Sequence, residues 1–178
     1  MKHLCLPLAV LLGFGSLSAQ VGELLPPEKL NEKRTTVVIW NQHHSGFNNR
    51  GSTLLNVVLI TKGKEIFRKN NVAIPWEPGK DCFLALIVPT AATDTVRVEI
   101  VESVQKGAGL AEIEFLRNEK NLAKGKVARA NGVLRGDKRD AEDRLTDGIT
   151  TSHKLHEGYW LSPDKEQAWA EVDVKTRD

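Results

Sequence analysis

Short segments rich in β-branched and aromatic residues recur along most of this chain, and turn residues separate them. In the segment Val-Arg-Val-Glu-Ile at 96–100, apolar residues alternate with charged ones. This alternation is typical of an antiparallel strand with one face on a core and the other in water. The pattern predicts an all-β sandwich of about eight strands. Strands are expected at 35–40, 54–61, 65–68, 83–88, 95–102, 111–115, 158–161 and 168–174.

The stretch 118–143 breaks this pattern. It is rich in Lys, Arg, Gly and Asn and holds only scattered apolar residues. A long segment without periodicity is typical of a solvated connector, although such connectors are uncommon inside a compact domain. We therefore expect this stretch to link two groups of strands.

The first residues have the features of an export signal. Lys2 and His3 form a short basic start, residues 4–14 form an apolar stretch, and residues 16–19 supply small side chains for cleavage. The apolar stretch is too short to span a membrane. We expect residues 1–19 to be a signal peptide, and the mature protein to be secreted or periplasmic. Residues 20–33 then form an N-terminal linker, and 34–178 form the domain.

Charge and cysteine content exclude several classes of protein. Lys and Arg total 25 against 23 Asp and Glu, which gives a formal net charge of +2, and both signs are spread along the chain. Such a chain has no strong field for a polyanion, so no nucleic-acid partner is expected. No run of 18 apolar residues follows the signal, so no membrane span is expected. In the mature chain a single cysteine, Cys82, remains in an apolar run, which indicates a buried and inert thiol.

Catalytic motifs are missing from the sequence. It contains no nucleophile elbow, no H-E-x-x-H, no phosphate-binding loop and no Cys/His arrangement. The pairs Glu112/Glu114 and Glu171/Asp173 are spaced to lie on outward strand faces, where they lack a cleft. We therefore expect that the protein is not an enzyme.

Four motifs in the last third of the chain resemble the opening half of a discoidin domain. These motifs are Asn-Leu-Ala-Lys-Gly-Lys at 121–126, Leu-Thr-Asp-Gly at 145–148, Tyr-Trp at 159–160 and Trp-Ala-Glu-Val-Asp-Val at 169–174. The family, also called coagulation-factor C-type or galactose-binding-like, opens with N-L-A-x-G-K, an A-x-D-G turn and a W-x-x-V-D-L strand. The resemblance implies a galactose-binding-domain-like jelly roll.

The earlier part of the chain resembles the closing half of the same family. The similarity covers Val-Ile-Trp-Asn at 38–41, Asn-Arg-Gly at 49–51, Val-Arg-Val at 96–98 and residues 109–114. Residues 34–117 thus resemble the second half of the family and residues 118–178 its first half. Either the domain is circularly permuted, or two half-domains pair with those of another copy in an exchanged dimer. Domain termini often lie close together, which favours the permutant.

The resemblance implies a calcium site where the Asp-Gly turn meets the closing strand. Carried over to this sequence, it assigns Ca²⁺ to Glu112, Asp147 and Thr151, and less surely to Ser152. Calcium takes six to eight oxygen ligands, and a turn with glycine can supply carbonyls. The alternative is an ordinary turn at Asp147, with Glu112 facing outward.

Family members bind glycans or other surface ligands through loops at one end of the sandwich. In this chain the corresponding loop offers amide, guanidinium and aromatic groups suited to sugars. The alternative is a solvated connection between strands. Trp160 and Trp169 lie in strands, so we expect them in core or semi-buried positions rather than as sugar platforms. The loop candidates are His43, His44, Phe47, Asn48, Asn49 and Arg50.

The histidines of the mature chain occur as His43-His44 and His153-x-x-His156. Zinc needs three or four convergent ligands, and an i, i+3 pair suits a helix, whereas His153 and His156 precede a predicted strand. The spacing therefore disfavours a zinc site.

The sequence as a whole predicts an exported, non-catalytic binding module for carbohydrate or a cell-surface polymer, stabilised by calcium. The alternative is a structural or assembly module that contacts another protein or itself and binds no sugar.

Overall fold

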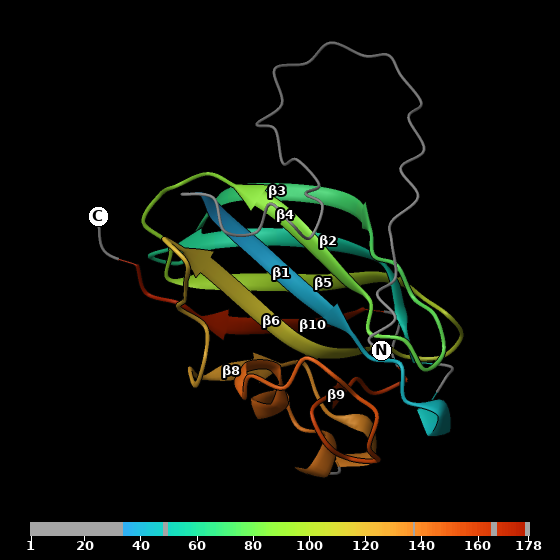
Figure 1. Cartoon of the computed structure of the whole chain (residues 1–178). Coiled ribbons are helices and arrows are strands. Elements are labelled where there is room, and N and C mark those ends of the chain that lie inside the picture. Colours follow the sequence, from blue (N-terminus) through green and yellow to red (C-terminus); the bar gives the residue numbers. More distant parts are fainter. Residues whose placement is uncertain (1–33, 48–49, 137, 165–166, 177–178) are drawn as a thin grey trace.

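The chain folds into two antiparallel sheets packed face to face (Figure 1). This computed structural model describes residues 34–47, 50–136, 138–164 and 167–176. The expected signal peptide, 1–19, and linker, 20–33, lie outside the described residues. The predicted all-β sandwich is confirmed. Among the described residues, no helix has the length and apolar character needed to cross a bilayer.

The first sheet has the order β4-β1-β6-β7, and β9 pairs with β6 off this path. Its strands are β4 (Phe83–Val88), β1 (Thr35–Asn41), β6 (Gly109–Arg117), β7 (Lys120–Asn121) and β9 (Trp160–Leu161).

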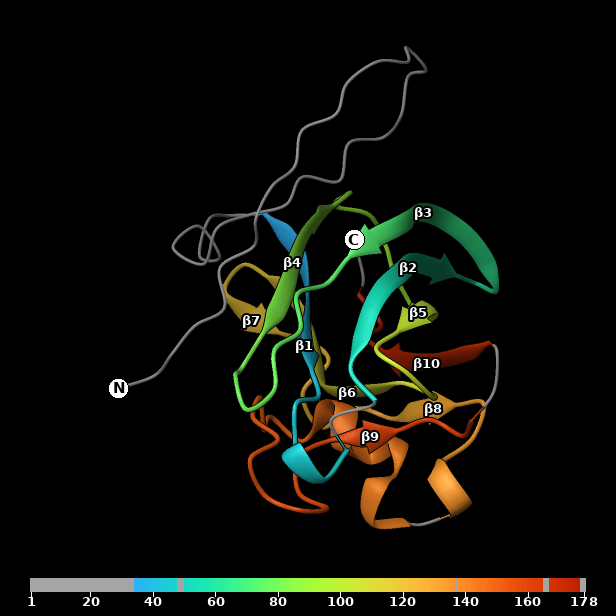
Figure 2. The same ribbon diagram turned by 90° about the vertical axis from the view of Figure 1, so that its right-hand side faces the viewer.

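The second sheet has the order β3-β2-β5-β10-β8. Its strands are β3 (Lys64–Ala73), β2 (Ser52–Thr61), β5 (Thr95–Ser103), β10 (Ala168–Asp173) and β8 (Ala128–Ala130). In the side view the two sheets form separate layers, and the turns before β9 gather at one end of the molecule (Figure 2).

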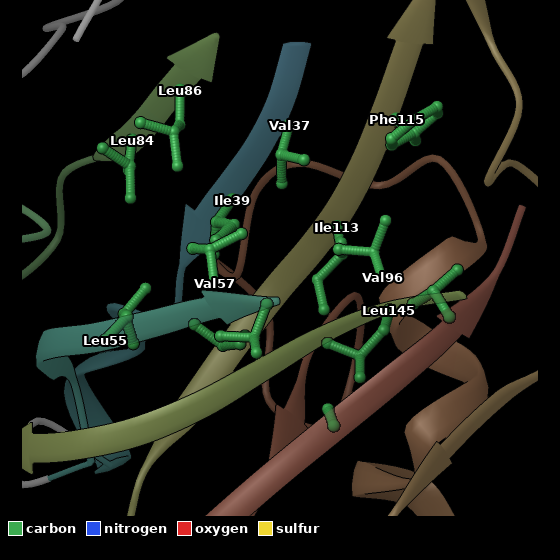
Figure 3. Packing of buried hydrophobic residues seen from close by; sticks show 14 of the residues in the cluster. Val37, Ile39, Leu55, Val57, Leu84, Leu86, Val96, Ile113, Phe115 and Leu145 are labelled. Carbon is green, nitrogen blue, oxygen red and sulfur yellow. The ribbon is translucent and has the colours of Figure 1, made fainter. Parts of the chain in front are cut away.

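The core lies between the sheets, as the alternation of apolar residues requires. Every second residue of β1 points inward, so Val37 and Ile39 are fully buried in the main cluster. They face Leu55 and Val57 of β2 across the sandwich (Figure 3). Cys82, directly before β4, is also fully buried, as predicted.

The two parts of the chain that resemble the family's halves share this single core. β10 pairs with β5 over six residue pairs, from Ala168↔Ile100 to Asp173↔Thr95. Ala170 of β10 lies in the same cluster as Val37 of β1. The last strand therefore belongs to the second sheet, between β5 and β8 of the same chain.

The stretch 118–143 is more structured than the sequence indicates. It contains β7, β8 and two 3-10 turns, η3 (Leu134–Gly136) and η4 (Lys138–Asp140), and a third, η5 (Glu142–Thr146), begins near its end. A few buried side chains, such as Ala123 and Leu134, anchor it. These elements are too short for a hydrophobic period to reveal them.

A β-bulge changes the direction of side chains in β6. Trp40 pairs with Glu112 and Asn41 with Leu110, so Ala111 is an extra residue in β6. Leu110 and Ile113 both face the core, while Ala111 joins a smaller cluster that includes Tyr159 on the other side of the sheet. The segment that leads to β9 thus covers the outer face of β6.

The expectation that Glu112 faces solvent is wrong, because this segment covers β6. Glu112 does point away from the core, but it is completely buried. The alternation of β6 gives the correct face, and the burial comes from η5 and the following turn, more than 30 residues later in the chain.

Replacing Ile113 by Ala should lower the free energy of unfolding by about 2–5 kcal/mol, because it opens a cavity at the centre of the core. Val127 is 59% exposed, and Val127→Ala should change stability by less than about 0.5 kcal/mol. Urea unfolding of both variants measures the difference. Equal destabilisation would contradict this assignment of the core.

Candidate functional site

The turn at Asp147-Gly148 lies directly over the Glu112 carboxylate. Gly148 has φ +85°, and a Cβ at this position would lie 2.8 Å from Cε of Lys124, so the turn needs glycine. Asp147 Oδ1 accepts a hydrogen bond from the Ile149 N–H at 2.7 Å, which fixes the turn locally. The backbone N–H of Gly148 then points at Glu112.

Glu112 is an ionisable group held away from water. Both of its carboxylate oxygens accept from the Gly148 N–H, at 3.3 and 3.2 Å. Burial, together with the neighbouring Asp147 and Glu114, raises the pKa of Glu112 to about 9, although the Gly148 hydrogen bond and the charge of Lys124 oppose the rise. A carboxylate in such a place requires a proton or a cation.

Two further side-chain oxygen atoms, one in Asp147 and one in Thr151, are buried and lack hydrogen-bond partners among the described residues. Oδ2 of Asp147 has no hydrogen bond from any described residue, and Arg144 Nη1 lies 3.9 Å away. Burial also raises the pKa of Asp147, against the hydrogen bond from Ile149 and the charge of Arg144. Oγ1 of Thr151 is likewise buried with no hydrogen-bond partner within the described chain. Such groups are rare in folded proteins, and a bound ion is one explanation for them.

The family resemblance implies calcium ligands at Glu112, Asp147 and Thr151. Glu112 and Asp147 lie beside the same turn, and the Thr151 hydroxyl follows four residues later. Two carboxylates and a hydroxyl are hard oxygen donors, and the turn adds backbone carbonyls. Ser152 does not join them, because its Oγ accepts a hydrogen bond from the His43 N–H at 2.8 Å.

The predicted glycan loop points largely inward. The side chain of His43 is 1% exposed. The Arg50 guanidinium is buried, donates to the Ser162 carbonyl at 3.0 Å and pairs with Asp164. Asn48 and Asn49 lie outside the described residues.

His44 and Phe47 are half-buried and take part in an aromatic group. Their rings lie 6.0 and 6.4 Å from the ring of Tyr159, and the Phe47 ring lies 5.8 Å from that of His156. The loop thus packs against the segment before β9, and only these two of its described candidates keep a partly exposed side chain.

The two tryptophans weighed as sugar platforms differ in position. Trp160 is fully buried, as predicted, and its Nε1 donates to the Gly132 carbonyl at 3.0 Å. Trp169 is half-buried, within the expectation of a core or semi-buried position. The Arg97 guanidinium carbon lies 5.0 Å from the centre of its ring.

Trp169 borders a groove of about 550 Å³ on the outer face of the second sheet. Nε of Arg97 donates to Glu171 Oε1 at 2.6 Å, and Arg68 donates to Glu99 at 2.8 Å. These bonds hold the side chains in place, and the bond from Arg68 lowers the pKa of Glu99. The groove is lined by Asn56, Arg97, Glu99, Ile100, Val101, Gln167, Ala168 and Trp169.

Sequence reasoning missed this groove, although part of the signal was present. The alternation at 96–100 puts Arg97 and Glu99 on one outward face, and that of β10 puts Trp169 and Glu171 on another. Only the register Trp169↔Glu99 and Glu171↔Arg97 makes the two faces continuous. The register of two strands 70 residues apart cannot be read from their sequences.

Comparisons of the chain with family models, with curated proteins and with solved structures found no match. We therefore argue its function from the geometry of these sites.

Without calcium, stability should fall as pH rises. An unfolded Glu112 loses its proton near pH 4.5, but the folded protein keeps it up to about pH 9. Between these values the unfolded state binds fewer protons, so Glu112 lowers the free energy of unfolding by up to about 1.4 kcal/mol per pH unit. Glu112→Gln cannot ionise and should lack this slope.

Urea unfolding of both proteins in chelator, from pH 5 to 9, measures the two slopes. Parallel pH profiles would show that Glu112 does not hold a raised pKa.

Proposed function

We propose that this chain is an exported, non-catalytic carbohydrate-binding module stabilised by calcium. The observation that carries the proposal is the groove over Trp169, where a partly exposed aromatic ring borders fixed polar side chains. Its volume is within the range of small-ligand sites.

The lining of the groove suits a sugar. The apolar face of a pyranose ring can stack on the exposed part of the Trp169 indole. Hydroxyl groups both donate and accept hydrogen bonds, and the groove offers donors from Arg97 and acceptors from Glu99, with amides from Asn56 and Gln167. Glu171 holds Arg97, and Arg68 and Asn56 hold Glu99. These side chains therefore lose little entropy when a ligand binds.

The calcium part of the proposal rests on Glu112, Asp147 and Thr151. These residues belong to β6 and the turn that covers it, whereas the groove lies on β2, β5 and β10 of the other sheet. Calcium would therefore stabilise the covering segment rather than touch the sugar. The permuted discoidin-like jelly roll is part of the same proposal, and the pairing of β10 with β5 supports it.

Calcium should raise the melting temperature of the mature chain, residues 20–178, and Asp147→Ala should abolish the rise. Asp143 provides a matched control, since it lies four residues earlier with a side chain that is 78% exposed. Asp143→Ala should keep the full calcium effect. Thermal unfolding with calcium and with chelator tests this, and an unchanged response in Asp147→Ala would reject the site.

A glycan array of the mature chain should identify a carbohydrate ligand, and Trp169→Ala should weaken its binding by about tenfold or more, or about 1.4 kcal/mol. Trp169→Phe keeps an aromatic face and should retain most of the affinity. Arg129→Ala removes a 52% exposed side chain on β8, away from the groove, and serves as the control.

If the folded protein binds no glycan, or if Trp169→Ala binds normally, the proposed groove is wrong. The alternative function, an assembly module, is then favoured. The outer face of the first sheet, where Val38, Phe83 and Ala85 form a separate apolar cluster, favours that alternative. Light scattering of the purified chain would then test for a defined oligomer.

A further inference from the structure

Three potential metal ligands from distant parts of the chain meet at one end of the sandwich. His43 follows β1, Asp81 precedes β4, and His153 lies between η5 and β9. One ligand atom from each, a ring nitrogen or a carboxylate oxygen, lies within 4.8 Å of the other two. This cluster shares no residue with the calcium assignment or with the groove.

The Asp81 carboxylate lies between the two imidazoles. Oδ1 of Asp81 is 2.8 Å from Nε2 of His43, and Oδ2 is 3.6 Å from Nε2 of His153. The two imidazole rings meet edge to face with their centres 4.6 Å apart. Neighbouring ligand atoms around a tetrahedral zinc ion are separated by about 3.3 Å, which follows from zinc–ligand bonds of about 2.05 Å. The distances from Asp81 to the two histidines, 2.8 and 3.6 Å, lie on either side of this value.

His43 is rigidly held within the cluster. Its N–H donates to Oγ of Ser152, which adjoins His153, and its carbonyl accepts from the N–H of Gly79, two residues before Asp81. The backbone of His43 thus ties together the three loops that carry the ligands. Pre-organised ligands lose little entropy when a metal binds.

His43 is almost completely buried and faces Asp81 through Nε2. Its side chain is 1% exposed, Nε2 bonds to Asp81, and Nδ1 has no hydrogen-bond partner in the described part of the chain. Asp81 and His153 are 26% and 55% exposed, so an ion can reach the cluster from solvent.

We propose that His43, Asp81 and His153 bind a zinc ion. Two imidazoles and one carboxylate are borderline-soft and hard donors that suit zinc, whereas calcium prefers oxygen alone. Three protein ligands leave a fourth position open to water or to an exogenous ligand. The zinc site joins the loops after β1, before β4 and before β9, and so fixes the end of the sandwich.

The i, i+3 spacing of His153 and His156 disfavours zinc, but His156 is not part of the cluster. The His156 ring instead lies against Phe47. The third ligand is Asp81, 72 residues before His153, and only the packing of the loops brings it to the histidines.

Titration calorimetry of the mature chain with Zn²⁺, in saturating calcium, tests the proposal. We expect one zinc ion per chain and a higher melting temperature. His153→Ala should abolish binding, and because this side chain is more than half exposed the variant should stay folded. His156→Ala removes a histidine from the same loop and should bind zinc normally. Co²⁺ should give the visible absorption of a tetrahedral site in wild type and in His156→Ala only.

No zinc binding by the folded wild type would overturn the proposal, as would equal affinity in His153→Ala. Binding that survives His153→Ala but is lost in Glu112→Gln would place the ion at the calcium site and also reject it. The calcium test uses Asp147→Ala and the glycan test uses Trp169→Ala. Failure of the zinc proposal is therefore distinguishable from failure of the calcium site or of the sugar-binding groove.

Discussion

The buried carboxylate of Glu112 is the constraint on which the covered half of this sandwich depends. The alternation of β6 points Glu112 away from the core, and the Gly148 turn covers it. A carboxylate removed from solvent is stable only with a proton, with hydrogen-bond donors or with a cation. Among the described residues, the Gly148 N–H is the one hydrogen-bond donor to Glu112, so the stability of this turn, and of the segment that follows it, depends on what neutralises the carboxylate.

The outer faces of the two sheets differ, because one is covered at β6 and the other carries an open groove. On the first sheet, η5 and the turn at Gly148 cover the outer face of β6, and the Glu112 carboxylate is buried beneath them. On the second sheet, β5 and β10 carry an open groove whose ion pairs hold Arg97 and Glu99 around Trp169. The candidate calcium ligands and the groove therefore lie on opposite sides of one core. The histidine cluster lies between loops at the end and joins neither.

The sequence predicts those features that depend on local alternation. The pattern at 96–100 gives β5 and its faces, and the run at 83–88 gives β4. The residues Glu112, Asp147 and Thr151 follow from the family resemblance, and the structure brings Glu112 and Asp147 to the same turn. What escapes the sequence depends on distant packing. β8 forms only by pairing with β10, and Glu112 is buried only because the turn at Gly148 covers it.

The most direct test of the account is a crystal structure of the mature chain grown with calcium, at a resolution that gives metal–oxygen distances. We predict an ion beneath the Gly148 turn, bound by Glu112, Asp147 and Thr151 at about 2.3–2.6 Å with carbonyl or water oxygens completing its shell. A water molecule or the Lys124 ammonium against the Glu112 carboxylate, with no cation, would contradict it.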